Sequence, residues 1–347
     1  MQSPHEPLLD ELLAALADAH DDEHLPTGTP RGPRPAFPRT LGKSPISPKP
    51  GLLSEPYTDA SPSHAETIGR YTIDHEINHG VVGNVYSAVD PKLGRRLIIK
   101  TVHYPAHRSA AQRSRQKEVI LRHVRNLAML QHPQIAVVYD VEEADDFCFI
   151  LMEYVPGTNL RRLLEREHHL ECERAVHVIL QVCRILEFVH AQDIVHGSLQ
   201  PGHVMLLPES DKIKLTEIGN VHLTDVERLG TNDRQVQVRE ENHALAYMAP
   251  ERAHGTMDAR IDVFSLGVIL YEAVTGRHPF GDEVAAFLPT GETFVPPSLV
   301  NLELPAEIDE LIGRALETDP DLRYQTMGKF RAALSHFQAS ILRRKHS

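Results

Sequence analysis

The chain changes once from strand-like to helix-like patterning, and this change limits the folds available to it. Before residue 155, polar–apolar alternation predicts strands over 71–90, 97–100, 135–141 and 147–154, with one helix over 107–131 between them. After the connector Val155–Thr158, apolar spacing predicts helices over 160–167, 173–192, 262–275 and 306–317. Strands followed by helices indicate an α+β fold, with a small β-rich lobe over 66–154, a helical lobe over 155–340 and a cleft between them.

Residues 1–65 are predicted to form a tail outside this fold. Residues 1–24 contain seven acidic residues and no Lys or Arg, and their leucines at helical spacing predict a short amphipathic helix. The stretch 26–63 holds ten prolines, which lack backbone donors and favour an extended, disordered linker. Two interpretations remain open: a helix that docks on a partner, or a disordered tail with weak local helicity.

Composition excludes several classes of protein. The formal net charge of −12 argues against non-specific binding to nucleic acid. No apolar run approaches the roughly 18 residues of a membrane span, and no secretory signal is recognisable. The three cysteines have no metal-ligand spacing and cannot all pair, so we expect a reducing, cytoplasmic location.

The β-rich half carries two features that suit phosphate groups. Gly80 and Gly83 lie in the turn of the first hairpin, where glycine lets backbone N–H groups approach a phosphate closely. Asn78 occupies the position of the first glycine in a G-x-G-x-x-G turn, so the motif is incomplete. Lys100 ends a following strand, where its ammonium group can reach phosphate oxygens. Either feature alone is a weak signal.

Further motifs follow in a fixed order: His196–Met205, Glu217–Gly219, Ala249–Glu251, Asp262 and Arg323. Together with the glycine turn and Lys100, they resemble the protein kinase family, specifically the bacterial Ser/Thr type, over residues 70 to about 338. The resemblance implies a bilobal kinase fold in which Arg323 pairs with Glu251 and Asp262 holds the backbone of the loop after His196. It also implies a stack that couples the lobes, made of Val138, Leu127, Ile218 and His196.

The residues that carry out phosphoryl transfer in this family are replaced here. Ser198 stands at the position of the Asp that accepts the substrate proton, and a serine hydroxyl is a poor proton acceptor. The other departures from the family pattern are Gly197 for the loop arginine, Gln200 for the loop lysine, His203 for a metal-binding Asn, Glu217 for the Asp of D-F-G, His123 for the helix Glu that pairs with the strand lysine, and Ala244 for an activation-segment threonine. No residue is therefore assigned with certainty as catalytic.

The resemblance places a nucleotide site at Gly80, Gly83, Val85, Ile98, Lys100, Glu153, Val155, Met205 and Glu217. Ile98 stands where the family has alanine, and its three extra carbons should crowd a purine at a cost of about 1–3 kcal/mol. Glu217 keeps a carboxylate that can hold one magnesium ion, although the loss of the Asn ligand weakens such a site. Binding of ATP and of magnesium therefore stays open.

The sequence-based prediction is a catalytically deficient kinase-fold protein, a pseudokinase, that acts in signalling by contact with a protein partner. The partner class is a kinase, a phosphatase or another effector, without nucleic acid or a membrane span. Three alternatives remain: a weak Ser/Thr kinase that uses Glu217, a transferase of nucleotides, and a nucleotide sensor. Modification of Thr224 or Thr231 by another kinase is also open.

Replacing Ile98 with Ala tests whether this side chain closes the nucleotide site. We expect Ile98→Ala to gain a melting-temperature shift of several degrees at saturating ATP, because ligand at one hundred times its dissociation constant stabilises by about 2.7 kcal/mol. Each protein is compared with its own nucleotide-free melting temperature. A shift in the parent at least as large as that in the variant would contradict the crowding.

Overall fold

The computed structural model describes residues 66–79, 83–103, 110–144, 147–218, 246–254, 257–281 and 294–345. Several predicted features lie outside these residues: the tail 1–65, Gly80, Gly219, Thr224, Thr231 and Ala244. The side chain of His123 is also outside the description, although its backbone belongs to a helix.

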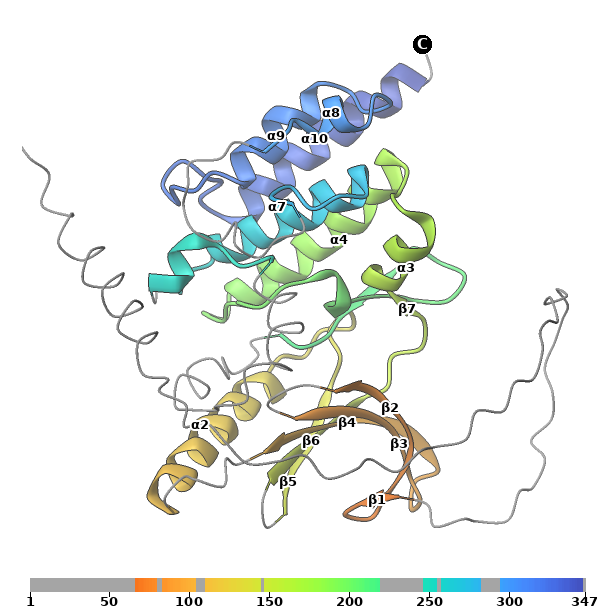
Figure 1. Cartoon of the computed structure of the whole chain (residues 1–347), viewed down its shortest axis with the longest axis vertical. Coiled ribbons are helices and arrows are strands. Elements are labelled where there is room, and N and C mark those ends of the chain that lie inside the picture. The colour runs from red at the N-terminus through yellow and green to blue at the C-terminus, as the bar shows by residue number, and fades with distance from the viewer. Residues whose placement is uncertain are drawn as a thin grey trace, which may run out of the picture. The chain divides into compact units, whose positions relative to one another are not determined.

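The first lobe is built on one six-stranded antiparallel sheet with the order β1-β2-β3-β4-β6-β5 (Figure 1). Its strands are β1 (Thr67–Ile68), β2 (Tyr71–His79), β3 (Asn84–Asp90), β4 (Arg95–His103), β5 (Val138–Glu143) and β6 (Phe147–Glu153). On β4, Leu97, Ile99 and Thr101 are buried and alternate with half-buried residues, as a strand with one core-facing side requires. The predicted strands are all present.

Strand β5 begins at Val138, three residues later than the apolar run from Ile135 predicts. The reason is a tertiary contact: Ile135 forms an isolated parallel bridge with Leu215 of the second lobe. Ala136 N–H donates to the Leu215 carbonyl at 2.9 Å, and Leu215 N–H donates to the Gln134 carbonyl at 2.8 Å. These residues therefore link the two lobes instead of extending the strand. The helix α2 (Ala110–Ala128) precedes this link, close to its predicted position.

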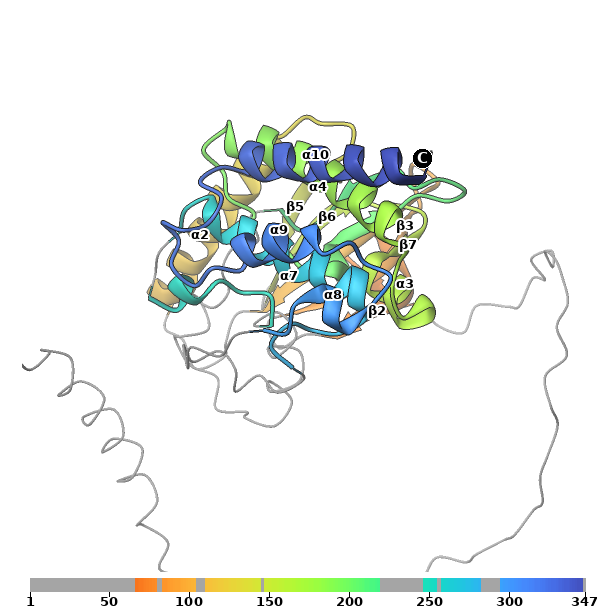
Figure 2. The ribbon, with the colours of Figure 1, turned by 90° about the horizontal axis from the view of Figure 1, so that it is seen from above.

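The second lobe is helical around a small sheet of β7 (Thr158–Asn159), β8 (Val204–Leu206) and β9 (Ile213–Leu215). Its helices are α3 (Leu160–Glu167), α4 (Cys172–His190), α7 (Arg260–Thr275), α8 (Pro297–Val300), α9 (Glu307–Ala315) and α10 (Met327–Lys345), with 3₁₀ turns at Pro201–His203 and Pro250–His254. Figure 1 shows α7 lying between α4 and α9, and Figure 2 shows the same helices from above. Almost every residue of α7 is buried, as expected for a central helix. At Gly267 an added Cβ would lie 2.8 Å from the Ala315 Cβ, so glycine permits the close packing of α7 on α9.

Helix α10 is absent from the sequence-based prediction. Its buried residues include Met327, Phe330, Leu334, Phe337 and Ile341, which follow helical spacing. The helix runs past residue 340 to Lys345, and its basic end is exposed. There Arg344 pairs with Glu307 of α9, so this helix end has an ion-pair partner.

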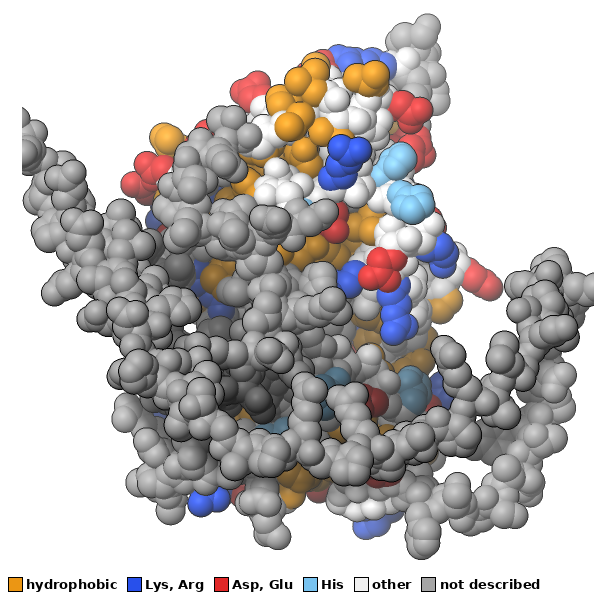
Figure 3. All heavy atoms as spheres, viewed as in Figure 1, with side chains coloured by type: hydrophobic (Ala, Val, Ile, Leu, Met, Phe, Trp, Pro, Cys, Tyr) orange, Lys and Arg blue, Asp and Glu red, His pale blue; other side chains and the backbone are white. Residues whose placement is uncertain are grey.

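The exposed surface of the helical lobe includes Val295, Leu299 and Leu302, which are 53%, 68% and 85% exposed. Figure 3 shows hydrophobic side chains gathered on the part of this lobe where Figure 1 places α8 and α9. Within the described residues, no helix is both long and apolar enough to cross a membrane.

A buried ion pair joins Arg323, between α9 and α10, to Glu251 in the turn Pro250–His254, as expected from the family resemblance. Arg323 is fully buried and donates from both terminal nitrogens to the Glu251 carboxylate, at 2.6 and 2.8 Å. The remaining guanidinium donors reach the backbone carbonyls of Glu317, Thr318 and Arg260. Because all donors have acceptors, the buried charge is fully compensated.

Removing one partner of this pair should destabilise the fold strongly. We expect Glu251→Gln to lower the free energy of unfolding by about 3–5 kcal/mol, because it leaves a buried guanidinium without its carboxylate. The matched control is Glu307→Gln, which breaks the exposed pair with Arg344 and should change stability far less. Urea unfolding of both variants measures the difference, and equal losses would contradict this account.

Candidate functional site

The loop that holds Ser198 is fixed by one buried carboxylate. Asp262, at the start of α7, is fully buried and accepts hydrogen bonds from the backbone N–H groups of His196 and Gly197, both at 2.8 Å. His190 Nε2 donates to the same carboxylate at 2.7 Å. Burial by itself would raise the pKa of Asp262, but the His190 hydrogen bond, the two nearby histidines and the Gly197 N–H hold this pKa below its usual range. The predicted role of Asp262 is therefore confirmed.

The loop places Ser198, Gln200 and His203 together, as predicted. The Ser198 hydroxyl is buried and has no hydrogen-bond partner among the described residues. The Gln200 side chain joins two neighbours: its amide N–H donates to His203 Nε2 at 3.0 Å, and its oxygen accepts from Arg161. The His203 ring also stacks on His196, with ring centroids 5.6 Å apart. None of these loop side chains carries a carboxylate.

His203 is held as a neutral imidazole. Burial lowers its pKa to about 3, because the charged form would lose its hydration there. The hydrogen bond from Gln200 to Nε2 places the ring proton on Nδ1, which has no partner among the described residues. A side chain in this state adds no positive charge to the cleft at neutral pH.

Lys100 pairs with Glu217, a partner that the sequence analysis did not assign to it. The Nζ atom of Lys100 on β4 contacts Glu217 Oε2, and both side chains are about 15% exposed (14% and 15%). Glu118 of α2 is exposed on the helix surface. The Glu217 backbone has a φ of +61°, a left-handed conformation that is costly for a residue with a side chain and often marks functional sites. The Lys100–Glu217 pair thus joins the first lobe to the segment after β9.

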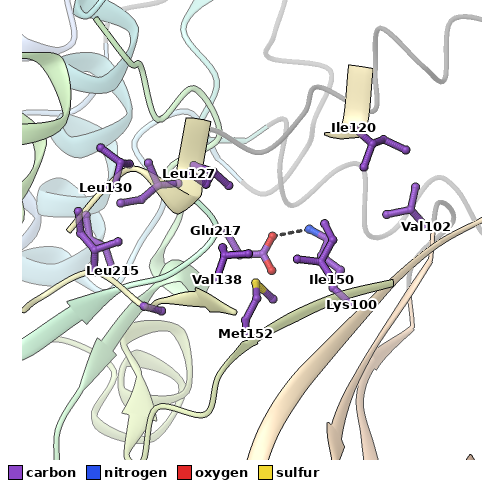
Figure 4. A pocket seen from close by; sticks show the side chains of 13 residues that line it. Lys100, Val102, Ile120, Leu127, Leu130, Val138, Ile150, Met152, Leu215 and Glu217 are labelled. Carbon is purple, nitrogen blue, oxygen red and sulfur yellow. Dashed lines mark hydrogen bonds and ion pairs between the residues drawn. The ribbon is translucent and has the colours of Figure 1, made fainter. Parts of the chain in front are cut away.

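Beside this ion pair lies an apolar cavity (Figure 4). Leu127, Val138 and Ile218, three of the four residues predicted to stack between the lobes, are among its lining residues, while His196 is not. Met152 lines it from β6, and Ile120 from α2. The cavity has a volume of about 50 Å³, enough to hold small molecules such as water. The stack is therefore looser here than a close-packed core.

The remaining residues of the predicted nucleotide site lie on several neighbouring elements. At Gly83 an added Cβ would meet the Thr101 carbonyl oxygen at 1.8 Å, so only glycine fits this approach of β3 to β4. Ile98 lies between Ser87 and Met152 in strand register, and Val85 lies opposite Lys100. The other members are Val155, which is buried after β6, Met205, which is half-buried on β8, and Glu153, whose carboxylate pairs with Lys214 at 2.5 Å. The tip of the glycine turn, including Gly80, is outside the described residues.

The described residues do not fit a magnesium site of the kinase type. Magnesium prefers hard oxygen ligands. The loop offers an imidazole at His203, and the Glu217 carboxylate is engaged by Lys100. Across the described residues, no group of three or more His, Cys, Asp or Glu side chains could hold a metal ion. Among these described residues, Glu217 therefore provides one carboxylate without a second protein ligand.

Two arginines near the loop were missed by the sequence analysis. Arg252, in the turn Pro250–His254, donates to the Gly197 carbonyl, and burial lowers its pKa to about 10. Arg161, in the first turn of α3, donates to Gln200. Both are distant in sequence from the residues that they contact, so no motif spacing could have indicated them. They place positive charge beside a loop in which Gly197 and Gln200 stand where the kinase family has an arginine and a lysine.

The pH dependence of stability should report on buried His203. Between pH 6.5 and about 3 the unfolded chain binds a proton at this residue and the folded chain does not, so stability falls as the pH drops through this range. We expect His203→Asn to remove this component, which amounts to at most about 1.4 kcal/mol per pH unit. Urea unfolding at several pH values between 4.5 and 6.5 measures it.

The control for this measurement is His336→Asn, which replaces an exposed histidine of α10. Its stability profile should stay parallel to that of the parent, because the side chain is in water in both states. A His203→Asn profile that also stays parallel to the parent would contradict the buried neutral state.

Comparisons with known proteins agree with this geometry. The model of the protein kinase domain matches residues 71–336. Ser/Thr-protein kinase PknB of Mycolicibacterium smegmatis is 33% identical over 274 residues, which are 76% of this chain and 42% of that protein. Ser/Thr-protein kinase PknA of Mycobacterium tuberculosis is 32% identical over 280 residues, which are 78% of this chain and 62% of that protein. The chain thus spans less than two thirds of either relative.

Solved structures support the fold. The PknI kinase domain of Mycobacterium tuberculosis has a TM-score of 0.59 at 22% identity, with 80% of this chain and 99% of that chain covered. Rad53 in complex with AMP-PNP has a TM-score of 0.60 at 22% identity, with 78% of this chain and 65% of that chain covered. The two-lobed architecture, the Asp262-held loop and the matched domain model together place this chain in the protein kinase family.

Proposed function

We propose that this kinase-family domain acts in signalling as a pseudokinase, by contact with a protein partner. The observation that carries the proposal is the state of Ser198: at the position of the family's catalytic base, its hydroxyl is buried and unpartnered among the described residues. A hydroxyl without a neighbouring base cannot take up the proton that an attacking serine or threonine releases. The proposal thus concerns the chemistry of the loop and leaves its fold intact.

The rest of the loop supports this proposal. Gln200 and His203 are both neutral at physiological pH, and the hydrogen bond between their side chains occupies the polar groups that would face a transferring phosphoryl group. The Asp262 contacts and the Arg323–Glu251 pair, by contrast, are complete. A firmly held domain with neutral loop side chains is suited to binding a protein.

The partner is proposed to be a protein of a signalling system, such as a kinase, a phosphatase or an effector. The exposed side chains Val295, Leu299 and Leu302 offer an apolar surface of the kind that protein partners cover. The acidic, leucine-containing segment 1–24 is a second contact element by its sequence. The cytoplasmic location also stays a proposal.

A second candidate is a Ser/Thr protein kinase of low turnover, and the comparisons favour it more than the pseudokinase. The relatives PknB and PknA are both named Ser/Thr-protein kinases, and the structural neighbour Rad53 is in complex with AMP-PNP. In this reaction an acceptor hydroxyl forms a bond to the γ-phosphorus of ATP, the bond to the β-phosphate oxygen breaks, ADP leaves, and the proton passes to water or to Glu217. Positioning and electrostatics provide most of the acceleration in phosphoryl transfer, so loss of the base lowers the rate without necessarily abolishing it.

The two candidates differ in whether phosphate moves. The purified full chain is incubated with ATP and either Mg²⁺ or Mn²⁺, alone and with serine-rich protein substrates, and intact mass records any added phosphate. The pseudokinase proposal expects no addition to the parent. It also expects added phosphate in Ser198→Asp/Gln200→Lys/His203→Asn, which restores the three loop groups on a fold that is already complete.

Phosphate addition by the parent would favour the low-turnover kinase, provided that Lys100→Ala and Glu217→Ala each abolish it. Loss in only one of these variants would indicate a contaminating kinase. Addition of a nucleotide instead of a phosphate would overturn both candidates and favour nucleotide transfer.

A further inference from the structure

Arg161 brings a guanidinium group from α3 to the catalytic loop. Its side chain is half-buried and donates to the Gln200 side-chain oxygen, across 39 residues of sequence. On the far side, Gln200 donates to His203 Nε2, so the amide is held at both ends. A side chain held in this way has a defined position, and so does the guanidinium that contacts it.

Among the described residues, no carboxylate lies within ion-pair distance of the Arg161 guanidinium. Five exposed or half-buried arginines do have such a partner: Arg70, Arg96, Arg166, Arg174 and Arg331. Burial raises the pKa of Glu272, and the charge of Arg161 opposes this shift. The Glu272 carboxylate accepts a hydrogen bond from the Tyr247 hydroxyl at 2.6 Å. Lys100 is paired with Glu217 and His203 is neutral. Arg161 is therefore a cation beside the loop that is available to an anionic group.

The position of this cation corresponds to that of a lysine at residue 200. A lysine side chain is one atom longer than glutamine, so its ammonium would extend just past the Gln200 amide. The group that hydrogen-bonds to the Gln200 oxygen lies in that direction. Gly202 lies beside it, and a Cβ added there would be in ordinary contact with Arg161 Nε, at 3.9 Å. Arg161 of α3 thus provides, beside Gln200, the positive charge that a lysine at residue 200 would carry.

We propose that Arg161 binds the terminal phosphate of a nucleoside triphosphate in this cleft, in place of a loop lysine. A guanidinium forms charge-assisted hydrogen bonds to phosphate oxygens and keeps its charge under all physiological conditions. This inference deepens the second candidate function, because it requires a nucleotide in the cleft. It does not require transfer, and so it also applies to a nucleotide-binding pseudokinase.

The test compares nucleotides that differ only in their phosphates. The dissociation constants of ATP, ADP and AMP are measured by calorimetry on the full chain, in the parent and in Arg161→Gln, Arg161→Lys and Arg162→Gln. Arg162 is the matched control, because it is the next residue of the same helix, is exposed, and loses the same charge. AMP reports on the adenosine part of the site and on whether each variant remains folded.

We expect Arg161→Gln to weaken ATP about tenfold and AMP hardly at all, as the loss of one charge-assisted hydrogen bond predicts. Arg161→Lys should recover part of the loss, and Arg162→Gln should bind ATP like the parent. Unchanged ATP binding in Arg161→Gln, or an equal loss for ATP and AMP, overturns the inference while leaving the kinase candidate in place. A parent that binds none of the three nucleotides overturns both, and the protein-binding proposal then stands alone.

Discussion

The structure depends first on the buried carboxylate of Asp262. It is fully buried, and hydrogen bonds from two backbone N–H groups and one histidine compensate its charge. A buried charge is tolerated only when such partners are complete, so α7 and the loop after His196 must adopt one mutual arrangement. The positions of Ser198, Gln200 and His203 follow from this arrangement. The frame of a kinase active site is therefore present whatever its side chains can do.

Within this frame the substituted side chains form a connected set. Arg161 contacts Gln200, Gln200 contacts His203, and His203 stacks on His196. The side chains at positions that carry out chemistry in a kinase contact one another here, whereas the Ser198 hydroxyl has no hydrogen-bond partner among the described residues. Such a set ties the loop side chains to one another and to α3, although His203 Nδ1 and both ring nitrogens of His196 are buried without partners among the described residues. This explains how a family fold persists with a changed loop, under either candidate function.

The cleft shows the same redistribution of contacts. Lys100 has Glu217 as its partner, so the strand and the segment after β9 are joined directly. Ile120 and Leu127 of α2 line the cavity beside the pair. An ion pair between Lys117 and Glu143 also joins α2 to β5, and the cavity indicates that the apolar contacts of this helix are incomplete beside the Lys100–Glu217 pair.

The sequence by itself determined the two-part architecture and most element positions, because strand and helix periodicity are local, regularly spaced signals. The Asp262 anchor and the Arg323–Glu251 pair were expected from the resemblance of its ordered motifs to the kinase family. It also identified which loop groups are missing. Only the tertiary structure decided that Ile135 leaves its strand to bridge Leu215, that Glu217 binds Lys100, and that Arg161 and Arg252 reach the loop. These contacts join residues far apart in the chain through long side chains. Their choice of partner depends on which charges and carbonyls the folded core leaves within reach, and no spacing in the sequence encodes that.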